Sequence, residues 1–290
     1  MIDWNSSQLK QQIEQWLRED IGTGDVTTMT TIPADRMAKG IIHVKEEGVV
    51  AGLPLAEAVF NVVDASLRFS ARTQEGSLVS KGTVLAEVEG SARSILLGER
   101  LALNLMQRLS GIATKTKRFV DALEGLPVRL VDTRKTTPGH RMLEKYAVTV
   151  GGGHNHRFGL YDAVMIKDNH IKAAGGILEA VSAARRAIPH TMKIEVEVES
   201  LAEVELALQS GADIIMLDNM PNASMREAVQ RISAAAPHVI IEASGNVNLQ
   251  TIHGIAQTGV HVISVGSLTY SVQALDISLD LNEKKGAQAE

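Results

Sequence analysis

Residues 151–170, GGGHNHRFGLYDAVMIKDNH, combine positively charged and protonatable side chains with a run of glycines and a short apolar segment. Between Arg129 and Lys172 basic side chains outnumber acidic ones, although the whole chain carries a net charge of -5. Because salt screens surface charges beyond about 8 Å, a small ligand in a cleft responds to such a local cluster more than to the net charge. The pattern predicts a site for a small polyanion and argues against general nucleic-acid binding.

Further candidates follow the apolar runs of the second half of the chain, because β/α barrels keep their reacting groups at the carboxyl ends of strands. The glycine-containing loops after the last two runs offer backbone N–H groups that can hold a phosphate, which favours a phosphate ester as ligand. The ends of successive runs supply Thr133, Arg134 and Lys135, then Lys167, Glu197, Asp218, Ser244 with Gly245, and Gly266.

Three of these candidates also have simpler explanations. Lys167 can be a solvated lysine at the rim of a sheet. Glu195, Glu197 and Glu199 alternate along one strand and share a face, which is either an inward face that needs cations or a solvated edge. Asp218 can be the N-cap of a following helix.

His154 and His156 form an H-x-H pair, the spacing with which some barrel hydrolases bind a metal ion. Such a site needs further histidines at later strand ends, and those ends carry other residue types. We therefore expect no protein-bound metal. A dinucleotide site is not expected either, because no G-x-G-x-x-G motif opens a helix.

Six apolar runs predict the strands that must position these side chains: VRLVDT, DAVMIK, KIEVEVE, ADIIMLD, HVIIEAS and VHVISVG. The segments LAEVELALQSG, SMREAVQRISAAA and LQTIHGIAQTG between the last four runs predict helices. Apolar strands joined by single helices predict a parallel sheet covered by helices, closed or nearly closed as in a barrel. A doubly wound open sheet is the alternative.

The first hundred residues predict a different architecture. Short alternating strands broken by glycines, as in a small antiparallel sheet, are expected over residues 40–90. The segment EGSLVSKGTVLAEVEG within them resembles half of a biotinyl or lipoyl carrier domain, but it lacks the carrier lysine in a hairpin. Residues 91–125 predict one helix, or two helices that meet near Gly111. We expect domains over residues 1–112 and 113–269, with the tail 270–290 returning to the first.

The composition is that of an ordinary globular protein. Of the 290 residues 44% are hydrophobic and only 3% are aromatic, so aliphatic side chains must fill the core. The chain has no cysteine, which excludes disulfides, thiolate nucleophiles and zinc held by cysteine. No signal-peptide pattern and no apolar run of about 18 to 20 residues is present, so we expect a cytoplasmic protein without a membrane partner.

Several long motifs, in order and spread over nearly the whole chain, resemble those of the quinolinate phosphoribosyltransferases. They are REDIGTGDVTT, GERLALNLMQRLSGIAT, VDTRKTTPGHRMLEKYAV, GGGHNHRFGLYDAVMIKDNH, IEVEVE, GADIIMLDN, EASGNV and VISVGSLTYSVQALDISL. The resemblance implies an incomplete parallel α/β barrel with a smaller N-terminal α/β sandwich domain. It also implies transfer of phosphoribosyl from phosphoribosyl pyrophosphate to quinolinate with decarboxylation, which yields nicotinate mononucleotide, pyrophosphate and CO2 for NAD biosynthesis.

The same resemblance implies roles for individual residues, with Lys135, Lys167, Glu197 and Asp218 as the catalytic candidates. Planar guanidinium groups suit the two carboxylates of quinolinate, because each can form paired hydrogen bonds. The implied quinolinate ligands are Arg134, His156, Arg157 and Lys167, with Arg100 of the partner subunit. The implied ligands of phosphoribosyl pyrophosphate are Thr133, Lys135, Glu197 and Asp218, and a 5′-phosphate cradle of Ser244, Gly245, Asn246, Val265, Gly266 and Ser267.

The resemblance further implies Mg²⁺ bound with phosphoribosyl pyrophosphate, and a homodimer with shared active sites, alone or within a higher oligomer. Two positions depart from the family pattern. Tyr270 stands where histidine is common, which puts one phosphate contact in doubt, and His154 receives no catalytic role. A molybdenum-associated relative is the nearest alternative within the fold, and the full set of quinolinate ligands weighs against it.

Overall fold

The computed structural model describes residues 2–123 and 125–283 and divides the chain into two units. Unit 1 comprises the chain up to Thr114 together with the chain from Val272 onward, and unit 2 comprises Lys115–Ser271. The part of the expected returning tail at 284–290 lies outside the described residues. No described helix combines the length and the apolar character that crossing a membrane requires.

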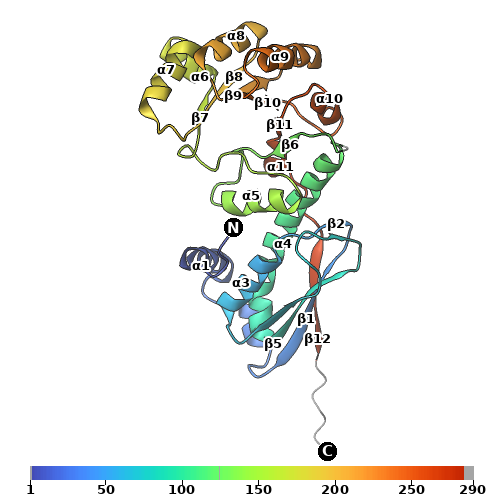
Figure 1. Ribbon diagram of the computed structural model, residues 1–290. Helices are drawn as coiled ribbons and strands as arrows, with labels where there is room; N and C mark the ends of the chain where they lie inside the picture. Colours follow the sequence, from blue (N-terminus) through green and yellow to red (C-terminus); the bar gives the residue numbers. More distant parts are fainter. Residues whose placement is uncertain (1, 124, 284–290) are drawn as a thin grey trace, which may run out of the picture. The chain divides into compact units, whose positions relative to one another are not determined.

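Unit 1 is built on an antiparallel sheet of four strands in the order β12-β1-β5-β3 (Figure 1), as the alternating pattern predicts. Residues on β1 alternate between buried and less buried, because successive side chains point to opposite faces of the sheet. The buried side chains of α3, among them Phe60, supply further core. The elements of unit 1 are α1 (Ser7–Ile21), α2 (Val26–Thr31), β1 (Met37–Val44), β2 (Gly48–Val49), α3 (Leu53–Val63), β3 (Arg68–Ala71), β4 (Leu78–Val79), β5 (Val84–Ser91), the first part of α4 (Ala92–Asp121) and β12 (Ile277–Glu283).

Helix α4 runs without interruption from Ala92 to Asp121, so the prediction of one helix is confirmed and the alternative of two helices meeting near Gly111 is wrong. Gly111 has a different role. A Cβ atom at this position would lie 2.2 Å from the carbonyl oxygen of Gln273 and 2.9 Å from the Val272 side chain. Glycine is therefore needed because the returning chain passes directly over the helix.

Unit 2 contains the six predicted strands in one parallel sheet, in the order β6-β11-β10-β9-β8-β7. The first strand along the chain therefore pairs with the last, and the order is cyclic with one break between β6 and β7. A doubly wound sheet places its first strands in the middle, so that alternative is wrong. An isolated parallel bridge between Val131 and His154 adds one residue on the open side of β6.

Helices α7, α8 and α9 lie along one face of this curved sheet (Figure 1). Along β8 the residues Ile194, Val196 and Val198 share one face and are buried, whereas Glu195 and Glu197 share the other. The elements of unit 2 are the end of α4, β6 (Arg129–Val131), α5 (Arg141–Val150), β7 (Val164–Ile166), α6 (Asp168–Ala174), α7 (Ile177–Ala187), β8 (Ile194–Val198), α8 (Leu201–Ser210), β9 (Ile214–Asp218), α9 (Asn222–Ala235), β10 (Ile240–Ser244), α10 (Ile252–Ala256), β11 (Val262–Ser264) and α11 (Ser267–Tyr270).

Candidate active site

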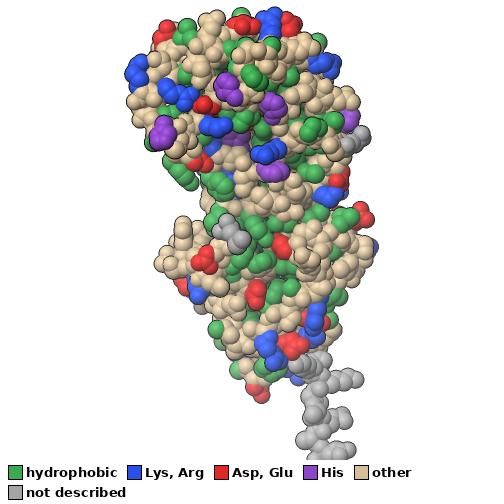
Figure 2. Space-filling view, in the orientation of Figure 1, with side chains coloured by type: hydrophobic (Ala, Val, Ile, Leu, Met, Phe, Trp, Pro, Cys, Tyr) green, Lys and Arg blue, Asp and Glu red, His purple; other side chains and the backbone are tan. Residues whose placement is uncertain are grey.

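A cavity of about 580 Å³ lies at the carboxyl ends of the strands of unit 2, which is the size expected for a small-molecule site. Figure 2 shows Lys, Arg and His side chains gathered on the visible face of this unit. The cavity is lined by Thr133, Arg134, Lys135, His156, Arg157, Met165, Lys167, Glu197, Met216, Asp218, Asn219, Ser244, Gly245, Asn246 and Ser264.

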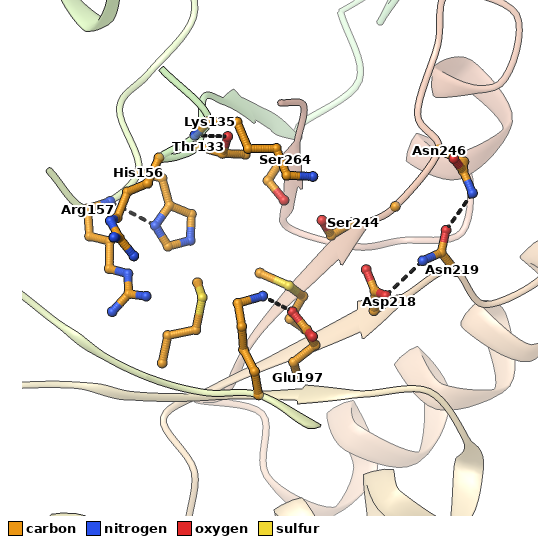
Figure 3. Close-up of a pocket in the computed structure, with 15 residues that line it drawn as sticks. Thr133, Lys135, His156, Arg157, Glu197, Asp218, Asn219, Ser244, Asn246 and Ser264 are labelled. Atoms are coloured by element: carbon orange, nitrogen blue, oxygen red, sulfur yellow. Dashed lines mark hydrogen bonds and ion pairs between the residues drawn. The ribbon is translucent and has the colours of Figure 1, made fainter. Parts of the chain in front are cut away.

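The lining residues are sorted by chemistry across the cavity (Figure 3). His156 and Arg157 lie on one side, Asn219 and Asn246 lie on the opposite side, and Glu197 and Asp218 lie between them. The cavity thus offers cations at one end, amide groups and a glycine-containing loop at the other, and carboxylates in the middle.

At the cationic end, Arg157 donates from Nη1 to the carbonyl oxygen of Ala163 at 2.9 Å, which fixes its side chain. Burial and the neighbouring Arg134 lower the pKa of Arg157 from its usual value. The Nε of Arg134 is buried and has no hydrogen-bond partner among the described residues. Two guanidinium groups held close together, one with an unused donor, favour a ligand with carboxylate groups.

In the centre, Lys167 at the end of β7 forms an ion pair and hydrogen bond with Glu197 of the neighbouring strand β8. The Lys167 side chain is 41% exposed, but it is paired with Glu197, so it is not simply a solvated lysine at the rim of the sheet. Glu195 is buried, Glu197 is half-buried and Glu199 is exposed beyond the end of the strand. The first two of these glutamates therefore face inward, where Lys167 pairs with Glu197 and His156 contacts Glu195.

At the far end, a chain of hydrogen bonds links the loops that follow β9 and β10. Asn219 donates to Asp218 Oδ2 at 2.7 Å, and Asn246 donates to Asn219 Oδ1 at 2.9 Å. Asp218 is not a helix cap, because the N-cap of α9 is Pro221. Gly245 has a φ of 90°, and a Cβ there would lie 2.3 Å from Asn219 Oδ1, so only glycine fits. The loop therefore exposes backbone next to the cavity.

The loop that carries His156 and Arg157 is anchored by a buried ion pair between Asp132 and Lys145, whose side chains are both 0% exposed. Asp132 also accepts the backbone N–H of His156 at 2.8 Å, and Lys145 donates to the His156 carbonyl at 2.9 Å. The Asn155 amide, oriented with its nitrogen toward Asp132, donates to Asp132 Oδ2 at 2.6 Å. Burial raises the pKa of Asp132 to about 6, although Lys145 opposes the rise, so the carboxylate remains ionised at pH 7.

Behind His156 lie two buried carboxylates, Glu195 on β8 and Glu242 on β10, that are absent from the predicted site. With His156 they form a group whose candidate ligand atoms all lie within 4.8 Å of one another. His154, the other half of the H-x-H pair, is exposed and does not belong to this group. The H-x-H pair therefore does not converge on one site. Alternation along β8 and β10 was the available signal, because Glu195 shares a face with Glu197, and Glu242 with Ser244.

The cavity brings together most of the predicted residues, but not all of them. Four further residues line it without having been predicted: Met165, Met216, Asn219 and Ser264. Lys135 Nζ lies 6.0 Å from the ring centre of Tyr270, the position that departs from the family pattern. The predicted residues that do not line it are Arg100, which belongs to unit 1 and is exposed on α4, and Val265, Gly266 and Ser267.

Replacing Lys145 by Met should destabilise the protein by about 3 to 5 kcal/mol, because Asp132 would remain buried without its cation. The matched control is Lys117→Met, which breaks an exposed ion pair with Asp121 and should cost about 1 kcal/mol or less. Denaturant titration followed by circular dichroism measures both. Equal stability of the two variants would contradict the anchoring role of Lys145.

Comparison with known proteins identifies the family of the chain. Models of the quinolinate phosphoribosyl transferase N-terminal and C-terminal domains match residues 25–110 and 112–280. A probable carboxylating nicotinate-nucleotide pyrophosphorylase of Bacillus subtilis is 46% identical over 96% of this chain and 94% of its own. One from Synechocystis is 48% identical, with 93% and 91% covered.

Solved structures agree with the sequence relatives. NadC from Streptococcus pyogenes has a TM-score of 0.92 to this chain, with 42% identity over 97% of this chain and 99% of its own. The nicotinate-nucleotide pyrophosphorylase from Francisella tularensis has a TM-score of 0.89 and 38% identity, with 97% and 100% covered. The cationic pocket at the strand ends therefore lies in a fold shared over nearly the full length of both. The chain belongs to the quinolinate phosphoribosyl transferase family.

Proposed function

We propose that this chain transfers phosphoribosyl from phosphoribosyl pyrophosphate to quinolinate and decarboxylates the product to nicotinate mononucleotide. The observation that carries the proposal is the division of the cavity into a guanidinium end, a carboxylate centre and a glycine-containing loop. The names of the relatives, which are carboxylating nicotinate-nucleotide pyrophosphorylases, support the same reaction.

Quinolinate is assigned to the end formed by Arg134, His156 and Arg157. Its two carboxylates match the two neighbouring guanidinium groups, and the unpartnered Nε of Arg134 supplies a donor. Lys167 lies at the border of this end, where it is paired with Glu197 in the absence of ligand and can pair with a quinolinate carboxylate when the substrate binds. Arg100 is proposed to enter from a second copy of the chain, since it does not line the cavity of its own subunit.

Phosphoribosyl pyrophosphate is assigned to the remaining part of the cavity. Its 5′-phosphate suits the loop of Ser244, Gly245 and Asn246, where the missing side chain of Gly245 leaves backbone accessible. Lys135 and Thr133 lie at the end of β6 and are suited to the pyrophosphate. The Mg²⁺ ion enters with the pyrophosphate as part of the substrate. Val265, Gly266 and Ser267 are proposed to extend the phosphate site.

The two carboxylates in the centre suit the sugar. The quinolinate nitrogen attacks C1 of the ribose while the bond from C1 to pyrophosphate breaks, so positive charge develops on the ribose in the transition state. Glu197 and Asp218, held by Lys167 and Asn219, can stabilise this charge more than they stabilise the ground state.

Decarboxylation follows from the new charge on the ring. The ribosylated nitrogen is positive, so the electron pair left on the adjacent carbon when CO2 departs is stabilised beside it. That carbon then takes up one proton, for which Lys167 and His156 are the candidates in the cavity. A homodimer with shared active sites and a cytoplasmic location complete the proposal.

Purified protein incubated with quinolinate, phosphoribosyl pyrophosphate and Mg²⁺ should form nicotinate mononucleotide, pyrophosphate and CO2. Chromatographic detection of the mononucleotide measures the reaction, and nicotinate in place of quinolinate is the control substrate. Turnover of nicotinate without turnover of quinolinate would overturn the proposal.

Glu197→Gln should lower kcat by about a hundredfold to a thousandfold, roughly 3 kcal/mol, because a neutral amide no longer stabilises the charge on the ribose. The KM for quinolinate should change much less. Glu199→Gln, an exposed glutamate two residues further on, is the control and should behave as the unaltered protein. Steady-state kinetics with both substrates decides; equal rates for the two variants would exclude a catalytic role for Glu197.

Arg100→Ala and Lys167→Ala should each abolish most activity when present alone. Mixing the two variants, with unfolding and refolding to exchange subunits, should restore about a quarter of the activity, because half of the subunits would pair in mixed dimers with one intact site each. The activity of the mixture is compared with that of each variant treated alone. Absence of recovery would mean that each subunit builds its site alone.

A further inference from the structure

The two glutamates behind His156 are more deeply buried than any function assigned so far requires. Glu195 is 2% exposed and Glu242 is 3% exposed. Their Oε2 atoms lie 3.3 Å and 3.4 Å from the same atom, Nε2 of His156. The other oxygen of each, Oε1, is buried and has no hydrogen-bond partner among the described residues. Two carboxylates thus converge on one ring nitrogen.

The second ring nitrogen fixes the tautomer of His156. Its Nδ1 accepts the backbone N–H of Arg157 at 2.7 Å, and a nitrogen that accepts a hydrogen bond carries no proton. Nε2 must therefore carry the ring proton, and this single N–H faces both carboxylates. Two ionised carboxylates that share one donor in a buried place repel each other, which favours a proton on one of them.

The charged groups around this cluster do not supply the missing positive charge. The charge of Arg157 acts on Glu195, but Arg157 also lies beside Arg134 at the cationic end of the cavity. Lys145 is engaged by Asp132, which itself accepts the His156 backbone N–H. A ligand that binds Arg157 therefore competes with Glu195 for the charge of that arginine.

Within the cluster, the pKa values of His156 and Glu195 are both raised. Burial by itself lowers the pKa of His156, but the hydrogen bonds with Glu195 and Glu242 outweigh burial and raise it to about 10. Burial, reinforced by the charge of Glu242, raises the pKa of Glu195 although the hydrogen bond with His156 opposes the rise. Groups this close titrate as one unit, so the raised pKa describes the second proton of the cluster and not the ring alone. The hydrogen bond that Nδ1 accepts leaves the carboxyl side as the place for that proton.

We propose that His156, Glu195 and Glu242 retain a second proton at neutral pH, held on the carboxyl pair, and that this proton permits the neighbouring arginines to bind a dianionic pyridine dicarboxylate. With the proton the cluster has a charge of −1, and without it the charge is −2. Glu195 and Glu242 are thus positioning residues that act through His156 and the pocket charge. The binding part of this inference rests on the proposed function, whereas the proton assignment does not.

Affinity for quinolinate should therefore be highest where the cluster is protonated and should fall as the pH rises toward 10. Glutamine has the shape of a protonated glutamic acid and cannot lose the proton. Glu195→Gln and Glu242→Gln should bind quinolinate with near-normal affinity at pH 7 and should lose less affinity at high pH. Near pH 10 each variant should bind quinolinate about tenfold more tightly than the unaltered protein, which is the effect of one unit charge at the distance between the cluster and the ligand.

Isothermal titration calorimetry with quinolinate between pH 7 and 10 measures this ratio. Lysine side chains also lose protons in this pH range, but they do so equally in every variant. Glu199→Gln is the control, and its pH profile should follow that of the unaltered protein. Parallel pH profiles for Glu195→Gln, Glu242→Gln and the unaltered protein would overturn the inference while leaving the proposed function intact.

Nitrogen NMR of the ligand-free protein with ¹⁵N-labelled histidine tests the proton assignment without substrate or activity. His156→Gln identifies the signals by their loss. An unprotonated Nδ1 and a protonated Nε2, unchanged from pH 6 to 9, are expected. A ring protonated on both nitrogens at pH 7 would overturn the placement of the second proton. A shift of the ring signals on addition of one equivalent of zinc would overturn it too, since the cluster would then be a metal site.

Discussion

The structure of unit 2 depends on compensating the negative charge of carboxylates that lie on the inner face of its parallel sheet. Strands buried under helices on one face need apolar residues there, which Ile194, Val196 and Val198 supply on β8. The opposite face carries Glu195 and Glu197, and β10 adds Glu242. A buried carboxylate is tolerated only with partners. Lys167 pairs with Glu197, the charge of Arg157 acts on Glu195, and Nε2 of His156 lies within reach of both Glu195 and Glu242. The charge inside the sheet and the cations of the pocket are one system.

The same requirement explains how the loop after α5 is held. Asp132 directly follows β6 and Lys145 lies on α5, and their ion pair is closed on every side by protein. Because both ends of the pair also bind the backbone of His156, strand, helix and loop are joined at one point. The Phe158 ring lies 5.0 Å from the Lys145 ammonium group and completes the enclosure. A rigid anchor of this kind suits a site that must hold two arginines close together despite their repulsion.

Much of this arrangement could be predicted from the sequence, because apolar runs mark strands and parallel strands end at one edge. Arg134, Lys167, Glu197 and Asp218 follow from that rule alone, and the family resemblance added the functional assignment. Glu242 lies within an apolar run, and nothing local indicates that its partner is His156. Asn219 and Asn246 interact only because their loops meet. Gly111 suggested a break in a helix, whereas its reason is the chain near Gln273, far away in sequence.

The ion pair between Lys167 and Glu197 influences which kinds of anion can bind in the cavity. Lys167 is already paired with Glu197 before anything binds, so an incoming anion competes with a carboxylate for its charge. An anion with a single charge, such as chloride or acetate, gains only a small binding energy in this competition. A compound with several negative groups can compensate by engaging the surrounding cations at the same moment. The pair thereby favours ligands with several negative groups over anions with a single charge.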